Sequence, residues 1–91
     1  MDKTVVIYTT PTCADCHALK RWLEVSGIPY DERDLTDVTI MEEVRARTGV
    51  RVAPITFVAD EFFYGTFTSQ RPKIAAALGL SADNAEKGQD G

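Results

Sequence analysis

The hydrophobic period of this chain changes near its beginning, across a short turn that leads into a pair of cysteines. Residues 3–8 read Lys-Thr-Val-Val-Ile-Tyr, a run rich in β-branched and aromatic residues that predicts a buried strand. After the turn, apolar side chains recur at Cys16, Leu19 and Leu23, and Gly27 can end the segment, which is the pattern of an amphipathic helix. We therefore expect a strand, a turn and a helix, with the cysteine pair where the helix begins.

The rest of the chain predicts a second strand and helix, then a hairpin and a third helix. We expect a half-exposed strand at 30–35, a helix capped by Thr36 or Asp37 and ended by Gly49, strands at 54–59 and 62–64, and a helix that Ser69 caps, with Pro72 in its first turn and Leu78 near its end. The order β-α-β-α-β-β-α predicts an α/β fold, with a four-stranded mixed sheet flanked by three helices. Its first two strands should be parallel, because a helix connects them.

The length of 91 residues allows one hydrophobic core, so we expect a single domain. We place this domain at 1–80. The segment 81–91 consists of small and polar residues, which cannot bury enough surface to order themselves, and we expect a flexible C-terminal tail there.

Charge and hydropathy exclude several classes of partner. The formal net charge of −4 disfavours binding to a nucleic-acid backbone. The apolar run at 5–8 is far too short for a membrane span or a signal-peptide core. We expect a cytoplasmic monomer that binds neither nucleic acid nor membrane.

Cys13 and Cys16 are three positions apart, which is close enough for a disulfide on one helical turn. Such a small loop stabilises a fold little, so redox chemistry is the better explanation for the pair. Cys13 lies at the positive end of the helix dipole, which favours its thiolate, and we expect it to attack a substrate disulfide. Cys16 continues the leucine stripe, and we expect it to be buried and to resolve the mixed disulfide.

Two charged neighbours are expected to modulate Cys13 in opposite directions. A protonated His17 would favour the thiolate, whereas the carboxylate of Asp15 would disfavour it. Replacing Asp15 with Asn should therefore favour the thiolate and make the cysteine couple more oxidising.

Three segments together resemble the glutaredoxin family of the thioredoxin superfamily, with features of the NrdH-type redoxins that serve ribonucleotide reductase. They are Val-Ile-Tyr-Thr-Thr-Pro-Thr-Cys-Ala-Asp-Cys at 6–16, Val-Ala-Pro-Ile-Thr-Phe at 52–57 and Tyr-Gly-Thr-Phe at 64–67. The resemblance implies a thioredoxin fold and a thiol–disulfide oxidoreductase that reduces protein or mixed disulfides, without a bound cofactor. It also implies that Pro54 is cis and faces the nucleophile, and that the backbone of Ala53 binds a substrate peptide or glutathione.

The resemblance assigns the substrate or glutathione site to Thr10, Thr12, Arg51, Ala53, Pro54, Gly65 and Thr66. Members that bind glutathione well carry a basic residue where this chain has Thr10, and Gly-Gly followed by Asp where it has 64–66. Arg51 can replace the missing carboxylate contact. Glutathione and thioredoxin reductase are therefore the two expected electron donors. With its single glycine at Gly65, this segment resembles the corresponding segment of redoxins that thioredoxin reductase reduces.

A non-catalytic role for the same two sulfurs is the alternative. Two thiolates at the start of a helix suit a carrier of Cu(I) or Hg(II), and some glutaredoxins bridge an iron–sulfur cluster through such a cysteine. A structural zinc site is disfavoured, because only His17 adds a further ligand. We therefore predict no resident metal site, with the soft-metal carrier and the iron–sulfur bridge kept as the alternative function.

Overall fold

The computed structural model describes residues 4–80 of the chain. Its elements follow the expected order: β1 (Val5–Thr9), α1 (Ala14–Val25), β2 (Asp31–Asp34), α2 (Val38–Thr48), β3 (Ile55–Val58), β4 (Glu61–Tyr64) and α3 (Phe67–Ala77). Lys3 of the first expected strand and the expected tail at 81–91 lie outside the described residues.

The four strands form one mixed sheet in the order β2-β1-β3-β4. β1 and β2 are parallel and are joined through α1, whereas β3 is antiparallel to both β1 and β4. The expected topology is therefore confirmed. β2 lies at an edge of the sheet with all of its side chains exposed, which explains why its sequence is polar.

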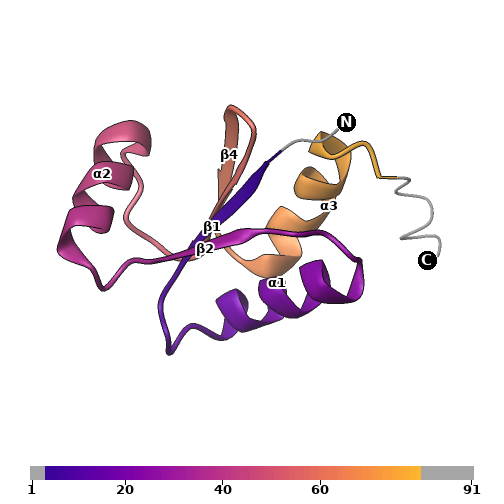
Figure 1. Ribbon diagram of the computed structural model, residues 1–91, viewed down its shortest axis with the longest axis horizontal. Coiled ribbons are helices and arrows are strands. Elements are labelled where there is room, and N and C mark those ends of the chain that lie inside the picture. Colours follow the sequence, from indigo (N-terminus) through magenta and orange to yellow (C-terminus); the bar gives the residue numbers. More distant parts are fainter. Residues whose placement is uncertain (1–3, 81–91) are drawn as a thin grey trace.

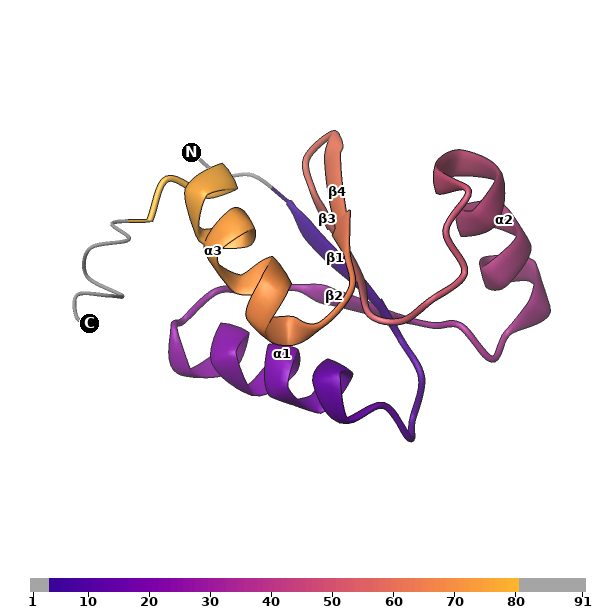
Figure 2. The ribbon, with the colours of Figure 1, turned by 180° about the vertical axis from the view of Figure 1, so that it is seen from behind.

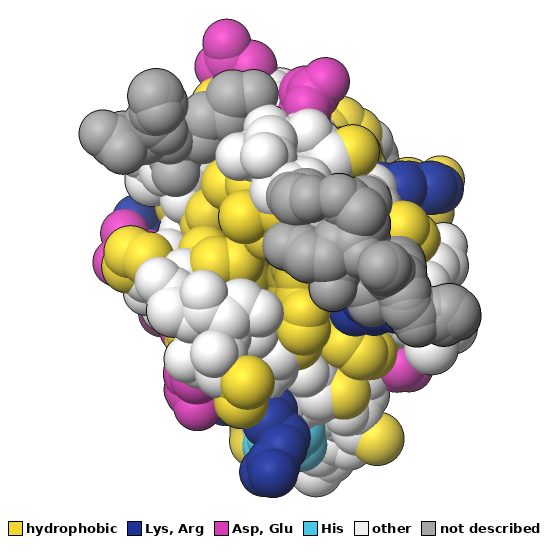
Figure 3. Space-filling model, turned by 90° about the vertical axis from the view of Figure 1, so that its right-hand side faces the viewer, with side chains coloured by type: hydrophobic (Ala, Val, Ile, Leu, Met, Phe, Trp, Pro, Cys, Tyr) yellow, Lys and Arg dark blue, Asp and Glu magenta, His cyan; other side chains and the backbone are white. Residues whose placement is uncertain are grey.

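Helices cover both faces of this sheet. α1 and α3 lie side by side on one face, and α2 lies apart from them on the other (Figures 1 and 2). Side chains of β1 alternate between the two faces of the sheet and so contribute to both hydrophobic layers. Val5 and Ile7 pack against α1 and α3, whereas Tyr8 packs on the side of α2. Hydrophobic side chains also form a band in the middle of the face seen in Figure 3. None of α1, α2 and α3 is long and apolar enough to cross a membrane.

The second helix begins at a conventional cap. The Asp37 carboxylate accepts hydrogen bonds from the backbone N–H groups of Thr39 at 2.9 Å and Ile40 at 3.3 Å, so Asp37 is the cap and Thr36 precedes it. Gly49 ends the helix with a φ of 74°, a left-handed conformation that glycine adopts without steric cost.

The expected start of the third helix was wrong. Thr66, not Ser69, caps α3, because the Thr66 hydroxyl accepts the hydrogen bond of the Ser69 N–H at 3.2 Å. Ser69 therefore belongs to the first turn, and Pro72 lies deeper inside the helix than we expected. There its ring leaves the carbonyl of Thr68 without the usual helical donor.

Candidate active site

The sheet topology gathers the candidate residues at one end of the strands, which we call the cysteine end. β1 and β2 are parallel and finish there together, with Thr9 paired to Asp34. β3 starts at the same end, where Ile55 pairs with Tyr8 of β1 and with Tyr64 at the end of β4. The turn before α1, the segment before β3 and the segment after β4 therefore all leave the sheet at this end.

Cys13 is the cap of α1 and is half-buried. Its Sγ accepts a hydrogen bond from the backbone N–H of Cys16 at 3.0 Å. A sulfur in this position receives a donor that the helix cannot otherwise satisfy, and this donor together with the helix dipole stabilises negative charge on the sulfur. The expected position of Cys13 at the helix start is confirmed, and both cysteines are free thiols.

Cys16 has the opposite environment. Its side chain is fully buried, as its place on the leucine stripe predicts. Burial is the main cause that raises the pKa of this thiol to about 12, and the hydrogen bond with Cys13 acts in the same direction. One turn of helix therefore holds an accessible sulfur and a buried, protonated one.

Asp15 connects the cysteine turn to the third helix. One carboxylate oxygen accepts the backbone N–H of Phe67, the first residue of α3, at 3.1 Å. The negative charge therefore lies at the positive end of a second helix dipole, which offsets part of its effect on Cys13. Sequence reasoning treated Asp15 only as a charge and missed this contact.

His17 is exposed, and its imidazole is directed at the turn. Nε2 lies 3.0 Å from the carbonyl oxygen of Pro11, to which a protonated nitrogen donates a hydrogen bond. The partner of the ring is therefore the turn that precedes Cys13.

The segment before β3 is fixed by a buried glutamine. The Ala53–Pro54 peptide bond is cis, as the resemblance implied, and Pro54 is buried. Gln70 of α3 has no exposed surface; its Nε2 donates to the carbonyl oxygens of Pro54 at 2.8 Å and Gly65 at 2.9 Å. Its Oε1 accepts the hydroxyl of Thr56 at 2.7 Å. Sequence reasoning missed Gln70, which holds two of the candidate segments together.

The remaining candidates differ in what their polar groups do. Thr10 is half-buried, and its carbonyl accepts the N–H of Cys13 at 3.3 Å. Thr12 is exposed, and Gly65 has a φ of 111°, a conformation that side chains rarely allow. The hydroxyl of Thr66 is occupied as the cap of α3.

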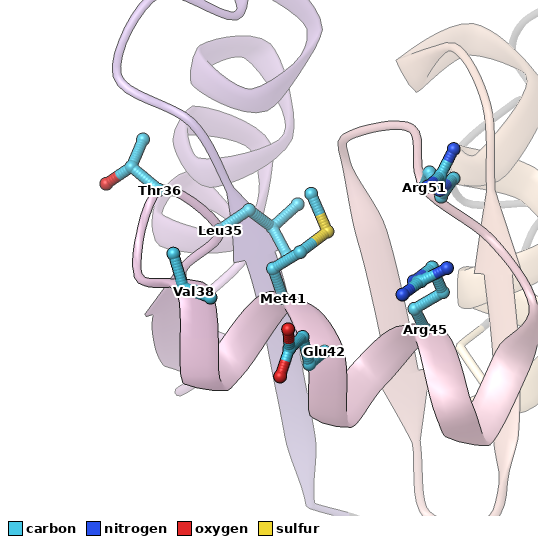
Figure 4. A pocket seen from close by; sticks show the side chains of 7 residues that line it. All are labelled: Leu35, Thr36, Val38, Met41, Glu42, Arg45 and Arg51. Atoms are coloured by element: carbon cyan, nitrogen blue, oxygen red, sulfur yellow. The ribbon is translucent and has the colours of Figure 1, made fainter.

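Arg51 lies farther along the cysteine end, beside α2. It lines a pocket of about 490 Å³ together with Leu35, Thr36, Val38, Met41, Glu42 and Arg45. The guanidinium groups of Arg51 and Arg45 lie on one side of this pocket, and the apolar side chains lie on the other (Figure 4). The structure therefore places Arg51 in a wider basic and apolar pocket, separate from the Cys13 turn.

Metal ligands do not cluster in the described part of the chain. Within residues 4–80, no group of three or more His, Cys, Asp or Glu side chains is placed to hold a metal ion.

The sequence matches a known family over most of its length. The family model of glutaredoxin matches residues 5–63. Glutaredoxin-like protein NrdH of Lactococcus lactis is 30% identical over 71 residues, which cover 78% of this chain and 99% of that protein. The global transcriptional regulator Spx 1 of Bacillus cereus is 40% identical over 42 residues, but these cover only 45% of this chain and 32% of the regulator.

Solved structures share the fold. The NrdH-redoxin of Escherichia coli superposes with a TM-score of 0.67 at 28% identity, over 82% of this chain and 93% of that one. A thioredoxin-like protein named BC3987, solved in a mutant form, superposes with a TM-score of 0.74 at 21% identity, over 82% of this chain and 99% of the other. The arrangement of three helices and a mixed four-stranded sheet is thus a thioredoxin-like fold.

Proposed function

We propose that this chain, which belongs to the glutaredoxin family, reduces protein or mixed disulfides by a dithiol mechanism through Cys13 and Cys16. Family membership supports thiol–disulfide oxidoreductase chemistry in general. The observation that carries the finer proposal is the unequal environment of the two free thiols, one half-buried at a helix start and the other fully buried.

The first step is attack by Cys13. Its thiolate bonds to one sulfur of a substrate disulfide, the substrate S–S bond breaks, and the other substrate sulfur leaves as a thiolate. The Cys16 N–H, 3.0 Å from the Cys13 sulfur, stabilises the attacking charge. Since this donor belongs to the helix backbone, it is in place before the substrate arrives.

The second step is resolution by Cys16. After losing its proton, its sulfur bonds to the sulfur of Cys13, and the bond between Cys13 and the substrate breaks. The substrate sulfur leaves as a thiolate, and the protein retains a Cys13–Cys16 disulfide. Two electrons from a donor then restore the dithiol.

We place substrate binding at the cysteine end of the sheet. An extended substrate segment would run beside Cys13 and use the backbone of Ala53, with the neighbouring surface supplied by Thr10, Thr12, Pro54, Gly65 and Thr66. Arg51 would bind an acidic group of the substrate, since its guanidinium has no ion-pair partner within residues 4–80. Asp15 and His17 would tune the reactivity of Cys13 from either side of the turn.

For the donor we propose thioredoxin reductase, with glutathione as the alternative. The cation that would bind a glutathione carboxylate is absent at Thr10. The similar redoxin of Escherichia coli is described as having a thioredoxin-like activity profile. We further propose that the protein acts as a cytoplasmic monomer, because a reducing compartment keeps its thiols free.

Two cysteine variants test the roles of the sulfurs. Cys16→Ser should accumulate a stable mixed disulfide at Cys13, seen by mass spectrometry after reaction with a disulfide peptide. Cys13→Ser should form none, because the remaining thiol is buried and protonated. The opposite pattern would reverse the assignment.

Turnover assays test the reaction and its donor. We expect insulin reduction with thioredoxin reductase and NADPH, and slower reduction with glutathione and its reductase. Equal or faster turnover with glutathione would assign the other donor. No turnover with either system, together with tight uptake of Cu(I) or Hg(II), would show that the two sulfurs serve a soft-metal carrier instead.

A further inference from the structure

In the dithiol reaction proposed above, the Cys16 thiol must lose its proton before its sulfur can attack Cys13. In the reduced protein, burial raises the pKa of Cys16 to about 12, and the hydrogen bond and charge of the Cys13 sulfur contribute to this rise. In the mixed disulfide the Cys13 sulfur carries no charge, so burial is the main cause that opposes the Cys16 thiolate. Few molecules would then carry a Cys16 thiolate at neutral pH. Groups that stabilise this thiolate therefore set the rate of the second step.

Two groups in the structure act in that direction. One is the backbone of Thr10, which forms a hydrogen bond with the Cys16 sulfur, and the other is the charge of Lys20. Lys20 follows Cys16 by four residues in α1, so the two side chains lie on the same side of the helix, one turn apart. Lys20 is thus the cation that acts on the buried sulfur.

Lys20 is held in place from the sheet. Its Nζ donates to Oε2 of Glu32 on β2 at 3.0 Å, and the hydroxyl of Thr9 on β1 donates to the same oxygen at 2.6 Å. These two hydrogen bonds lower the pKa of Glu32, so its carboxylate stays charged at neutral pH. Thr9 is only 4% exposed, so its hydrogen bond ties the Glu32 carboxylate to a buried residue of the sheet. We call these three residues the Lys20–Glu32–Thr9 network.

The network borders a polar pocket beside the first half of α1. The pocket measures about 440 Å³ and is lined by Thr9, Pro11, His17, Lys20, Glu32 and Asp34. Solvent in this pocket therefore reaches Lys20 and Glu32, whereas Cys16 does not line it.

The other charged groups around Cys16 have different partners or positions. On β2, Glu32 and Asp34 line the pocket, and Glu32 pairs with Lys20. On the side of α3, the carboxylate of Asp15 is bound to the N–H of Phe67. His17 lines the pocket and contacts the turn. Cys13 and Lys20 are the two charged groups that shift Cys16 directly, and only Lys20 favours the thiolate.

We propose that Lys20, held by Glu32 and Thr9, is a positioning residue for the second step, and that its ammonium group stabilises the attacking thiolate of Cys16. The Cys16 thiol loses its proton to solvent, and the Cys16 sulfur bonds to the Cys13 sulfur. The bond from Cys13 to the substrate breaks, and the substrate sulfur leaves as a thiolate. Lys20 gains and loses no proton in this sequence.

Rapid mixing of the reduced protein with an aromatic disulfide tests this role, because each step releases one coloured thiolate. The first phase reports attack by Cys13, and the second, independent of reagent concentration, reports resolution. Lys20→Met should slow the second phase at neutral pH by about threefold, the effect of roughly half a pKa unit. Lys20→Arg, which keeps the positive charge, should restore the wild-type rate of this phase. The first phase should keep its wild-type rate.

Three further variants separate charge from structure. Lys20→Arg keeps the charge and should retain the wild-type rate of the second phase. Lys73→Met on the exposed side of α3 is the matched control and should change nothing. Glu32→Gln keeps the acceptor for Lys20 but removes the opposing charge, so it should speed the second phase.

The outcomes distinguish this inference from the function on which it rests. A slower second phase in Glu32→Gln, or the same loss of rate in Lys20→Arg as in Lys20→Met, would overturn the role of Lys20. If the wild type itself shows no second phase, the dithiol function fails.

Discussion

The helices on the two faces of the sheet are held very differently. α1 buries Cys16, Leu19 and Leu23 completely against the sheet and α3. α2 buries only Val44, and its neighbours Ile40 and Met41 remain partly exposed. The two helices have similar lengths, 12 and 11 residues, so the difference lies in their sequences and not in their size.

In the function proposed above, this contrast corresponds to two separate tasks. Sulfur exchange requires fixed positions for two atoms, and the cysteines lie on the tightly packed helix. Recognition of varied substrates tolerates a looser surface, and the exposed arginines Arg45 and Arg51 lie in the pocket beside α2. We therefore expect substitutions on the α1 side to change stability and chemistry, and substitutions on the α2 side to change substrate preference.

The largest difference should appear in a pair of truncations of similar volume. Leu19→Ala should lower the free energy of unfolding by about 3 kcal/mol, because it leaves a cavity in a fully buried site. Ile40→Ala on α2 should cost only about 1 kcal/mol, because that side chain is already partly exposed. Urea unfolding followed by circular dichroism measures both. Equal losses would remove the contrast between the faces.

Replacement of the buried polar residue Gln70 on α3 should have the next largest effect. Gln70→Met keeps the length of the side chain but leaves the carbonyls of Pro54 and Gly65 and the hydroxyl of Thr56 without their partner. We expect a loss of about 2 kcal/mol in the same measurement. Ser69→Ala, on the exposed side of the same helix, is the control and should stay within about 0.5 kcal/mol of the wild type.

The third prediction concerns Asp15, the charged residue between the two cysteines. Asp15→Asn keeps an oxygen for the Phe67 N–H but removes the negative charge, so the thiolate of Cys13 and hence the reduced protein should be favoured. We expect the equilibrium constant for exchange between the Cys13–Cys16 disulfide and glutathione to change about fivefold in favour of the reduced protein. This corresponds to a free-energy change of order 1 kcal/mol.

The matched variant Asp15→Ala removes both the charge and the hydrogen bond. It should show the same redox shift and an additional loss of stability. A redox equilibrium in Asp15→Asn that equals the wild type would mean that the dipole of α3 already cancels this charge.

The smallest effect is expected on the α2 side. Arg51→Gln should raise KM for an acidic disulfide peptide about threefold and leave kcat unchanged, because an exposed ion pair contributes less than about 1 kcal/mol. Steady-state kinetics with acidic and neutral peptides measures the change. Arg21→Gln, an exposed residue on α1, is the control. A fall in kcat would contradict a role of Arg51 in substrate binding alone and would indicate that it affects the reaction step.

Sequence reasoning succeeded where neighbours along the chain decide the structure. The stripe of Cys16, Leu19 and Leu23 predicted which cysteine is buried, because helical spacing alone puts it on the core face. It failed at α3, where Thr66 and Ser69 are equally good caps by chemistry. In the structure the helix begins directly after Gly65, which has a φ of 111°, and Thr66 is the residue in the cap position.

Contacts across long stretches of sequence were not predictable from a single chain. The partners of Gln70 include Thr56, 14 residues away, and Asp15 reaches Phe67 across 52 residues. Glutamine and aspartate are usually exposed, so nothing in their local sequence indicates a buried or helix-capping role. The ion pair between Lys20 and Glu32 was not predicted for the same reason. It joins a helix to a strand in which every residue is charged, so the sequence does not indicate which charge pairs with Lys20.

The hydrogen bond from Phe67 to Asp15 also has a consequence for biosynthesis. A ribosome completes both cysteines early, but the residues that hold their turn and the cis-proline segment belong to α3, near the end of the domain. A nascent chain that stops before Phe67 therefore carries the two thiols without the contacts that arrange them. In the dithiol function proposed above, selective reactivity at Cys13 would therefore depend on the docking of the last helix.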